Sequence, residues 1–143
     1  MPDIKNKLNL EVKHREAWRP FCPSFTSESF EFYFGHNKPA DFMIIAYYIK
    51  KKFISLFPSA VHIDGSVRPQ SVKKETNPLF HSLIEEFGKL SGHPVLINTS
   101  FNVQGEPIVE TPRDALRCFG GTGIDVLVIG NYILEKWNYN KTF

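Results

Sequence analysis

The sequence predicts a single α/β domain, residues 1–143, in which a twisted mixed sheet is flanked by helices. The length is that of one ordinary domain. A hydrophobic content of 42%, with thirteen phenylalanines, indicates a packed core. Helical and strand-like patterns alternate along the second half of the chain, and the dipeptide Asp64-Gly65 predicts at least one hairpin turn.

The first helix is predicted from a four-residue repeat of apolar side chains. Ile4, Leu8 and Val12 form one stripe, and the helix is expected to run from its N-cap Asp3 to about Glu16. The prolines that follow end it, because a residue before proline favours extended geometry.

The middle of the chain predicts one short helix and three strands. The helix is expected within residues 24–34, and a buried strand at residues 42–48, which are apolar throughout. Two further strands, at 60–63 and 67–72, are expected to pair around the Asp64-Gly65 turn. Pro69 cannot donate to a ladder, so the second of these is expected at an edge or a bulge.

The second half predicts two well-delimited helices. The first is capped by Asn77, begins at Pro78 and ends before Gly92. Its apolar stripe consists of Leu79, Leu83, Phe87 and Leu90. The second follows the cap Thr111, carries an acid at Asp114 and ends at residues 120–121. Strands are predicted at 95–98, 126–129 and 132–134.

Composition narrows the function classes. The net charge of +2 is too small to indicate binding to nucleic acid or to a membrane surface. Cys22 and Cys118 lie far apart with no CxxC spacing, which favours reduced thiols over a metal site or a disulfide. No run approaches eighteen apolar residues and no signal peptide is recognisable, so we expect a cytoplasmic protein.

A cluster of hydrogen-bonding side chains follows the strand predicted at residues 95–98. The cluster comprises Asn98, Thr99, Ser100 and Asn102. A strand that leaves a core in this way delivers polar groups to a ligand at its carboxyl end. The cluster contains no general base and therefore predicts a substrate-binding loop.

Four cationic side chains stand near predicted breaks in secondary structure. They are Lys13, Arg15, Arg19 and Arg68. Arginine suits bidentate recognition of phosphate, and lysine adds a point charge. If two or three converge on the polar loop, they would bind a polyanion such as ATP. The alternative is that they complement helix ends and face water.

His62 and Asp64 are two positions apart on a predicted strand, so they would share one face. Asp64 would then hold Mg²⁺, and His62 would bind substrate or transfer a proton. The favoured alternative places Asp64 in a turn, bonded to its own backbone. The sequence has no Gly-rich phosphate loop of either common type.

Three blocks of the sequence resemble the carbamoyltransferase family, which contains nodulation-factor and antibiotic O-carbamoyltransferases. The blocks are LNLEVKHREAWRPFCPS, AVHIDGSVRPQSV and GHPVLINTSFNVQGEPIVETPRDALRCFGGTGIDVLVIGNYILEK. They occur in the family's order and cover residues 7–136. The match is to the C-terminal, YrdC-like module, and it begins after the family's Gly-Pro-Arg-rich block, so the first strands of the module are expected to be absent.

The resemblance implies a two-step activity with ATP and carbamoyl phosphate as substrates and Mg²⁺ as the metal. The C-terminal module would form carbamoyl adenylate, and an N-terminal transferase module, the implied partner, would pass the carbamoyl group to an acceptor hydroxyl. By motif, Lys13 and Arg19 resemble the phosphate-holding pair, and Arg68 and Ser100 resemble further ligands of the donor and nucleotide.

Two other functions are compatible with the residues. The first is a non-catalytic module that binds nucleotide or docks to a partner domain without turnover. The second is an RNA-binding protein, because YrdC-like folds also occur in tRNA-modification enzymes. The small net charge and the lack of a basic stripe argue against RNA.

Overall fold

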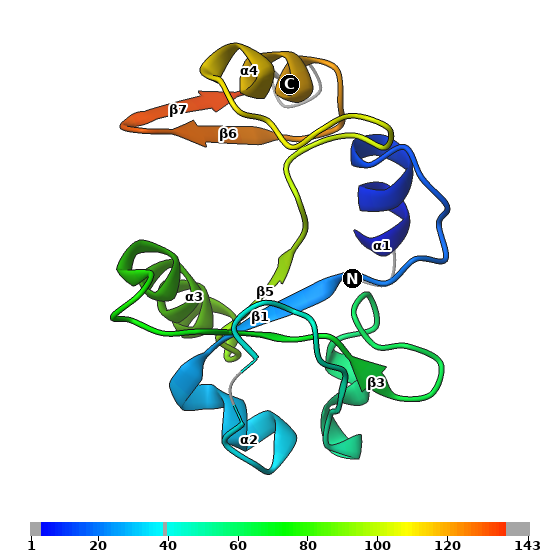
Figure 1. Cartoon of the computed structure of the whole chain (residues 1–143), viewed down its shortest axis with the longest axis vertical. Helices are drawn as coiled ribbons and strands as arrows, with labels where there is room; N and C mark the ends of the chain where they lie inside the picture. The colour runs from blue at the N-terminus through cyan, green and yellow to red at the C-terminus, as the bar shows by residue number, and fades with distance from the viewer. Residues whose placement is uncertain (1–3, 39, 137–143) are drawn as a thin grey trace, which may run out of the picture. The chain divides into compact units, whose positions relative to one another are not determined.

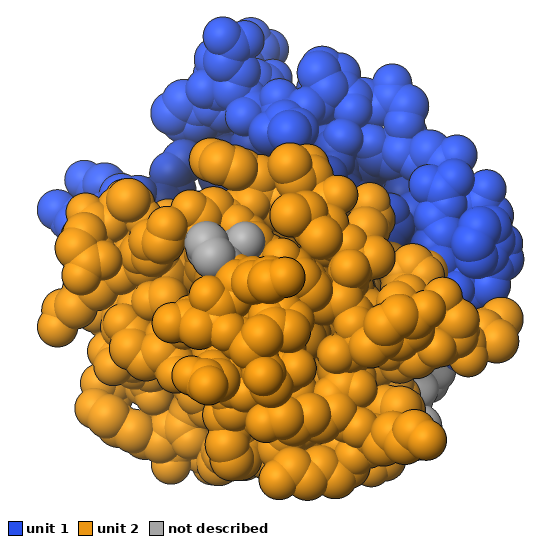
Figure 2. Space-filling model, turned by 60° about the horizontal axis from the view of Figure 1, so that its bottom comes forward, with its two compact units in different colours: residues 1, 3–19, 100–143 blue, residues 2, 20–99 orange. Residues whose placement is uncertain are grey.

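A computed structural model of the chain describes residues 4–38 and 40–136. Helices and small sheets alternate along the chain, which confirms the predicted mixed α/β class (Figure 1). The chain divides into two compact units (Figure 2). Unit 1 contains described residues 4–19 and 100–136, and unit 2 contains residues 20–38 and 40–99. The expectation of one domain stays a prediction.

The main sheet lies in unit 2 and has three strands in the order β4-β1-β5. The central strand β1 (Cys22–Thr26) pairs parallel with β4 (Gln70–Val72) and antiparallel with β5 (Val95–Asn98), so the sheet is mixed as predicted. β4 is an edge strand, as expected of a strand that follows Pro69. The other strands form two separate pairs, whereas the sequence had suggested one sheet.

Aromatic side chains form the core of unit 2. Phe25 from β1 contacts Tyr33 and Phe34 of α2 (Phe30–Phe34), with ring centroids 4.9 and 5.2 Å apart. Phe30 stacks on Phe34 at 4.3 Å. Each aromatic ring buries a large apolar area, which explains how short elements stabilise this unit.

The remaining elements of unit 2 are short. The 3-10 turn η2 (Ser27–Ser29) precedes α2, and a second one, η3 (Lys51–Leu56), follows β2 (Tyr47–Tyr48). Strand β2 pairs antiparallel with β3 (Ser66–Val67).

Helix α3 (Pro78–Ser91) confirms its predicted boundaries. The Asn77 side chain accepts a hydrogen bond from the Phe80 amide, and Gly92 ends the helix in a left-handed conformation. The predicted packing face is wrong, however, because the stripe of four apolar residues is exposed; Leu79 and Leu90 are 85% and 89% accessible. The helix instead buries His81 and Ile84 and packs on β1 and β5.

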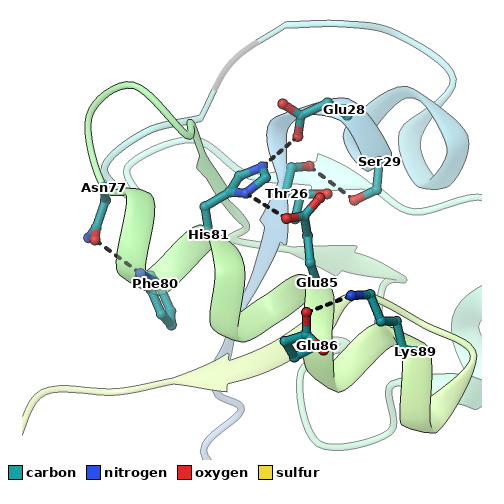
Figure 3. A network of polar contacts seen from close by, with 9 residues as sticks. All are labelled: Thr26, Glu28, Ser29, Asn77, Phe80, His81, Glu85, Glu86 and Lys89. Carbon is teal, nitrogen blue, oxygen red and sulfur yellow. Dashed lines mark hydrogen bonds and ion pairs between the residues drawn. The ribbon is translucent and has the colours of Figure 1, made fainter.

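A buried histidine fastens α3 to the turn η2, as Figure 3 shows. Nε2 of His81 lies 2.9 Å from Oε2 of Glu28, and Nδ1 lies 3.4 Å from Oε2 of Glu85. Burial alone raises the pKa of Glu28, but hydrogen bonds, foremost that with His81, outweigh it and the pKa is lowered. The contacts of His81 with Glu28 and Glu85 hold this face of α3 inward.

Two predicted strands of unit 2 are corrected by the structure. Residues 42–48 are not a buried strand: only Tyr47–Tyr48 pairs, and Phe42 and Ile44 are 78% and 81% exposed. Residues 60–63 do not form a strand: residues 60 and 63 lie in turns, and the two residues between them have no regular structure. The segment 67–72 is divided at Arg68-Pro69, because proline offers no amide to the ladder.

Unit 1 begins with a helix that changes its winding. A regular turn, α1 (Ile4–Lys7), passes into wider turns, η1 (Leu8–Val12), in which the Lys13 amide bonds to the Leu8 carbonyl at 2.8 Å. The helix ends at Val12 and not near Glu16 as predicted. The proposed cap Asp3 lies outside the described residues.

The rest of unit 1 consists of α4 (Pro112–Gly120) and the antiparallel hairpin β6 (Val126–Ile129) and β7 (Tyr132–Glu135). The predicted capping box of Thr111 and Asp114 is present. Ala115, Phe119 and Leu127 form the buried core of this unit. None of the helices within residues 4–38 and 40–136 combines the length and hydropathy needed to cross a membrane.

Candidate functional site

A small polar pocket in unit 1 has a volume of about 130 Å³. One wall is the segment 13–19, which follows η1, and the other is the loop 100–104. The lining residues are Lys13, Arg15, Arg19, Ser100, Asn102, Val103 and Gln104. The structure therefore brings together five of the residues that the sequence singled out, from positions far apart in the chain.

Lys13 joins the two walls. Its Nζ lies 2.8 and 3.1 Å from the carbonyl oxygen and Oγ of Ser100, and 2.7 and 2.6 Å from the carbonyl oxygen and Oδ1 of Asn102. Its own carbonyl accepts from the Gln104 amide at 3.0 Å. An ammonium has three donors, so these oxygens engage all of them. Lys13 thus orders the loop, and its role as a direct phosphate ligand stays a prediction.

The charge of Lys13 is held in a buried position, since only 4% of the residue is accessible. Burial, and then the charge of Arg15, lower the pKa of Lys13. Two cations close enough to oppose each other's charge favour a bound anion, which would relieve the repulsion.

The two arginines of the pocket are held from outside it. Nε of Arg15 donates to Oδ1 of Asn9 at 2.7 Å. Nε of Arg19 pairs with Oε2 of Glu16 at 3.0 Å, and its guanidinium carbon lies 5.9 Å from the centre of the Trp18 ring. The Arg15 guanidinium therefore has a defined direction at the pocket wall, which suits recognition of phosphate or carboxylate, whereas the Arg19 guanidinium is shared with the Glu16 carboxylate.

The loop 100–104 is ordered by its own side chains as well. The Ser100 hydroxyl donates to Oδ1 of Asn102 at 2.6 Å, and Nδ2 of Asn102 donates to the Glu106 carbonyl at 2.8 Å. Of the polar cluster predicted as a substrate-binding loop, Ser100 and Asn102 lie in this loop, and ligand binding by the cluster stays a prediction. Its Ser100 and Asn102 oxygens face a lysine of this same chain.

The other predicted site residues lie in unit 2. Nδ2 of Asn98, at the end of β5, donates to Oε1 of Gln70 at 2.9 Å, and Thr99 is exposed. Arg68 is exposed between β3 and β4, and no described residue pairs with its guanidinium. These positions are compatible with ligand binding but do not test it.

His62 and Asp64 do not share a strand face, since their segment is a turn. The Gly65 amide bonds to the His62 carbonyl at 2.9 Å, and Oδ1 of Asp64 accepts from the Ser66 amide at 2.9 Å. The hydrogen bonds of Ser66, that of its side chain first, lower the pKa of Asp64. The structure therefore gives the turn that the sequence favoured.

Metal-ligating side chains are dispersed over the described residues. No group of three or more His, Cys, Asp or Glu side chains within them is placed to hold a metal ion. Magnesium is usually held by one or two carboxylates together with substrate phosphates. A metal site built from protein side chains alone is therefore not found within residues 4–38 and 40–136.

Sequence reasoning missed Asn9 and Gln104. Asn9 is fully buried and bonded to Arg15, and Gln104 lines the pocket. Both are common polar residues on predicted helix or loop surface. The one usable signal is that asparagine is a poor helix former, which is unexpected in the last turns of a helix.

Comparison with known proteins identifies the family. Residues 1–136 match the family described as Carbamoyltransferase C-terminus. An uncharacterized protein of Methanocaldococcus jannaschii is 40% identical over 135 residues, 94% of this chain and 22% of that protein.

Two relatives carry functional names. Nodulation protein NolO of Bradyrhizobium diazoefficiens is 37% identical over 92% of this chain and 25% of its own length. The 3'-hydroxymethylcephem-O-carbamoyltransferase of Amycolatopsis lactamdurans is 32% identical over 89% of this chain and 24% of its own length. The chain thus spans about a quarter of the length of these relatives. The match over almost its whole length shows that it belongs to the carbamoyltransferase C-terminus family.

Proposed function

We propose that this chain is the donor-binding part of a carbamoyltransferase, which binds carbamoyl phosphate and ATP for transfer of a carbamoyl group to an acceptor hydroxyl. The observation that carries the proposal is the pocket of unit 1, where Lys13 fastens the loop of Ser100 and Asn102 beside Arg15 and Arg19. Family membership and the named O-carbamoyltransferase relative support the reaction class.

The pocket suits the phosphate end of the donor. Its volume of about 130 Å³ is well below the several hundred Å³ typical of pockets that enclose a drug-sized ligand such as a nucleotide. Three cationic residues line it, and two of them, Arg15 and Arg19, would give charge-assisted hydrogen bonds to an anion of the size of phosphate or carbamoyl phosphate. We assign carbamoyl phosphate to this pocket.

The proposed chemistry develops negative charge that these residues would stabilise. Hydrolysis of carbamoyl phosphate gives phosphate and carbamate, and a carbamate oxygen attacks the α-phosphorus of ATP. Pyrophosphate leaves and carbamoyl adenylate forms, after which the acceptor hydroxyl takes the carbamoyl group and AMP leaves. Arg15 and Arg19 would bind phosphate oxygens, and preorganised donors of this kind act on the transition state.

The proposal includes further ligands in unit 2 and a partner. Arg68, Asn98 and Thr99 are proposed for the donor and nucleotide, and Mg²⁺ is included as a companion of the ATP phosphates. An N-terminal transferase module is the proposed partner, as the resemblance to the carbamoyltransferase family implies.

Calorimetric titration of the 143-residue chain with carbamoyl phosphate tests the proposal. Loss of a charge-assisted hydrogen bond costs about 1.5–3 kcal/mol, so Arg19→Ala is expected to weaken binding about 10- to 100-fold. Arg113→Ala is the matched control, because Arg113 is an exposed arginine of α4 outside the pocket. No binding by the unaltered chain, or equal loss in both variants, would overturn the assignment.

Pyrophosphate release distinguishes the second candidate, a non-catalytic binding module. The engagement of Lys13 Nζ by oxygens of Ser100 and Asn102 of this same chain favours it. Carbamoyl phosphate binding with ATP-dependent pyrophosphate release supports the enzyme, whereas binding without release supports the module.

A further inference from the structure

One buried amide in unit 1 lies outside the pocket and yet contacts the segment that carries its cationic residues. Asn9 is 0% accessible and lies in the wide turns of η1. Wide turns of this kind occur frequently at functional sites. Asn9 does not line the pocket, so its role must act through other residues.

The wide turns free the Asn9 carbonyl for a contact beyond the helix. In a regular α-helix the Lys13 amide would bond to Asn9, but here it bonds to the Leu8 carbonyl at 2.8 Å. The Asn9 carbonyl instead accepts from the Arg15 amide at 2.9 Å. The chain between them turns sharply, since His14 has a left-handed φ of 52°.

The Asn9 side chain bonds to three residues of that turned segment. Oδ1 accepts from Nε of Arg15 at 2.7 Å. Nδ2 donates to the carbonyl of Ala17 at 3.2 Å and to that of Arg19 at 2.8 Å. One side chain thus orients the Arg15 guanidinium and fixes the backbone from which Arg19 extends.

We propose that Asn9 is a positioning residue for the anion pocket, acting through Arg15 and Arg19. Holding an arginine in place before the ligand arrives reduces the rotamer entropy lost on binding. Only an amide of this length supplies both the acceptor for Nε and the two N–H donors. This inference rests on the proposed function, because it takes an anion such as phosphate to be the pocket's ligand.

The test measures the anion affinity of the pocket together with the NMR signal of the Arg15 side chain. Carbamoyl phosphate and inorganic phosphate are titrated into the unaltered chain, Asn9→Ala and Asn9→Asp, while the Arg15 Nε–Hε resonance and its solvent exchange are followed by NMR. Asn9→Ala is expected to weaken affinity tenfold or more and to speed Nε–Hε exchange. Asn9→Asp keeps an acceptor oxygen and is expected to retain the slow exchange.

Thr122→Val is the matched control. The Thr122 side chain is a buried polar group of unit 1 that donates to the Cys118 carbonyl, outside the pocket lining. The Thr122→Val substitution is expected to lower the stability of the protein without changing the anion affinity or the Arg15 Nε–Hε signal.

The outcomes separate this inference from the proposed function. Affinity within twofold of the unaltered chain in Asn9→Ala, or an Arg15 signal lost in Asn9→Asp as well, would overturn the positioning role. If the unaltered chain binds neither anion, the proposed function fails, and the positioning role of Asn9 is decided by the Arg15 Nε–Hε signal alone. Unchanged exchange in Asn9→Ala then overturns the role, and faster exchange supports it. If Asn9→Ala does not fold, Asn9→Asp decides by its own criterion: retained slow exchange of Arg15 Nε–Hε supports the role, and loss of that signal overturns it.

Discussion

Nζ of Lys13 donates a hydrogen bond of 2.6 Å to Oδ1 of Asn102, which lies 89 positions later in the chain. The same ammonium contacts three further oxygens of the loop 100–104. Lys13, which the sequence suggested as a substrate ligand, therefore stabilises the loop 100–104 through hydrogen bonds. Its loss would affect the stability of unit 1 as well as the charge of the pocket.

We predict that Lys13→Met lowers the free energy of unfolding by about 1.5–3 kcal/mol, because it removes hydrogen bonds from a charged, buried donor. Urea denaturation measures the effect. Lys7→Met is the control, since it removes only the exposed pair with Asp125 at 3.1 Å and is expected to cost about 1 kcal/mol or less. Equal stabilities of the two variants would show that Lys13 does not fasten the loop.

The elements that could be predicted from sequence are those defined by local chemistry. Asn77, Pro78 and Gly92 delimit α3, and the Thr111–Asp114 capping box begins α4. The inward face of α3 could not be predicted, because apolar periodicity indicated the stripe that is exposed. Long-range contacts, such as that between His81 and Glu28, decide that face instead.

The site could be predicted in part, for a similar reason. Lys13, Arg19 and the loop residues Ser100 and Asn102 were found by motif, and the pocket unites them. Asn9 was missed because its burial depends on wide helical turns, which the apolar pattern does not reveal. The prediction of a strand that carries His62 was wrong, because the chain forms a tight turn from His62 to Gly65.

Gly88 provides a test of how closely α3 approaches Pro94, the residue before β5. A Cβ at this position would lie 2.8 Å from Cβ and 2.9 Å from Cα of Pro94. Alanine favours a helix over glycine by about 1 kcal/mol. The overlap with a rigid proline is expected to exceed this gain, so Gly88→Ala should lower the free energy of unfolding by about 1–2 kcal/mol.

Gly120→Ala is the matched control for Gly88→Ala. Gly120 also lies in a helix, α4, and a Cβ there would meet no atom within 4 Å. This substitution should raise stability by up to about 1 kcal/mol. Thermal or urea unfolding of both variants gives the comparison, and a stabilising Gly88→Ala would contradict the close approach.

Acid should destabilise the protein through Asp41. Hydrogen bonds from Lys73, at 2.8 Å, and then from Ser71 lower the pKa of this carboxyl. The unfolded state therefore binds more protons than the folded state, and stability falls as pH drops from about 4 through the folded pKa. When the pH is lowered from about 5 to about 2, the free energy of unfolding of Asp41→Asn should fall less than that of the unaltered chain.

Glu31→Gln is the control for this pH dependence, because Glu31 is an exposed carboxylate of α2 in the same unit. Its variant should keep the acid sensitivity of the unaltered chain. The comparison uses the free energy of unfolding measured in urea at several pH values. Parallel profiles for Asp41→Asn and the unaltered chain would contradict the assignment of this carboxyl.

Glu16 should restrain anion binding, because it pairs with Arg19 at the wall of the pocket. Oε2 of Glu16 lies 3.0 Å from Nε of Arg19, and both side chains are half-exposed. A bound phosphate would have to share this guanidinium with a carboxylate of the same charge. Glu16→Gln removes the competing charge and, for a pair this exposed, should strengthen carbamoyl phosphate binding about two- to fivefold.

Calorimetry at two salt concentrations checks the sign and the cause of this effect. The gain of Glu16→Gln should shrink in high salt, where exposed charges are screened. Glu110→Gln, which removes an exposed carboxylate outside the pocket lining, should leave the affinity unchanged. Weaker binding by Glu16→Gln would mean that Glu16 holds Arg19 in its productive direction, and the pair would then be part of the anion site instead of a competitor for it.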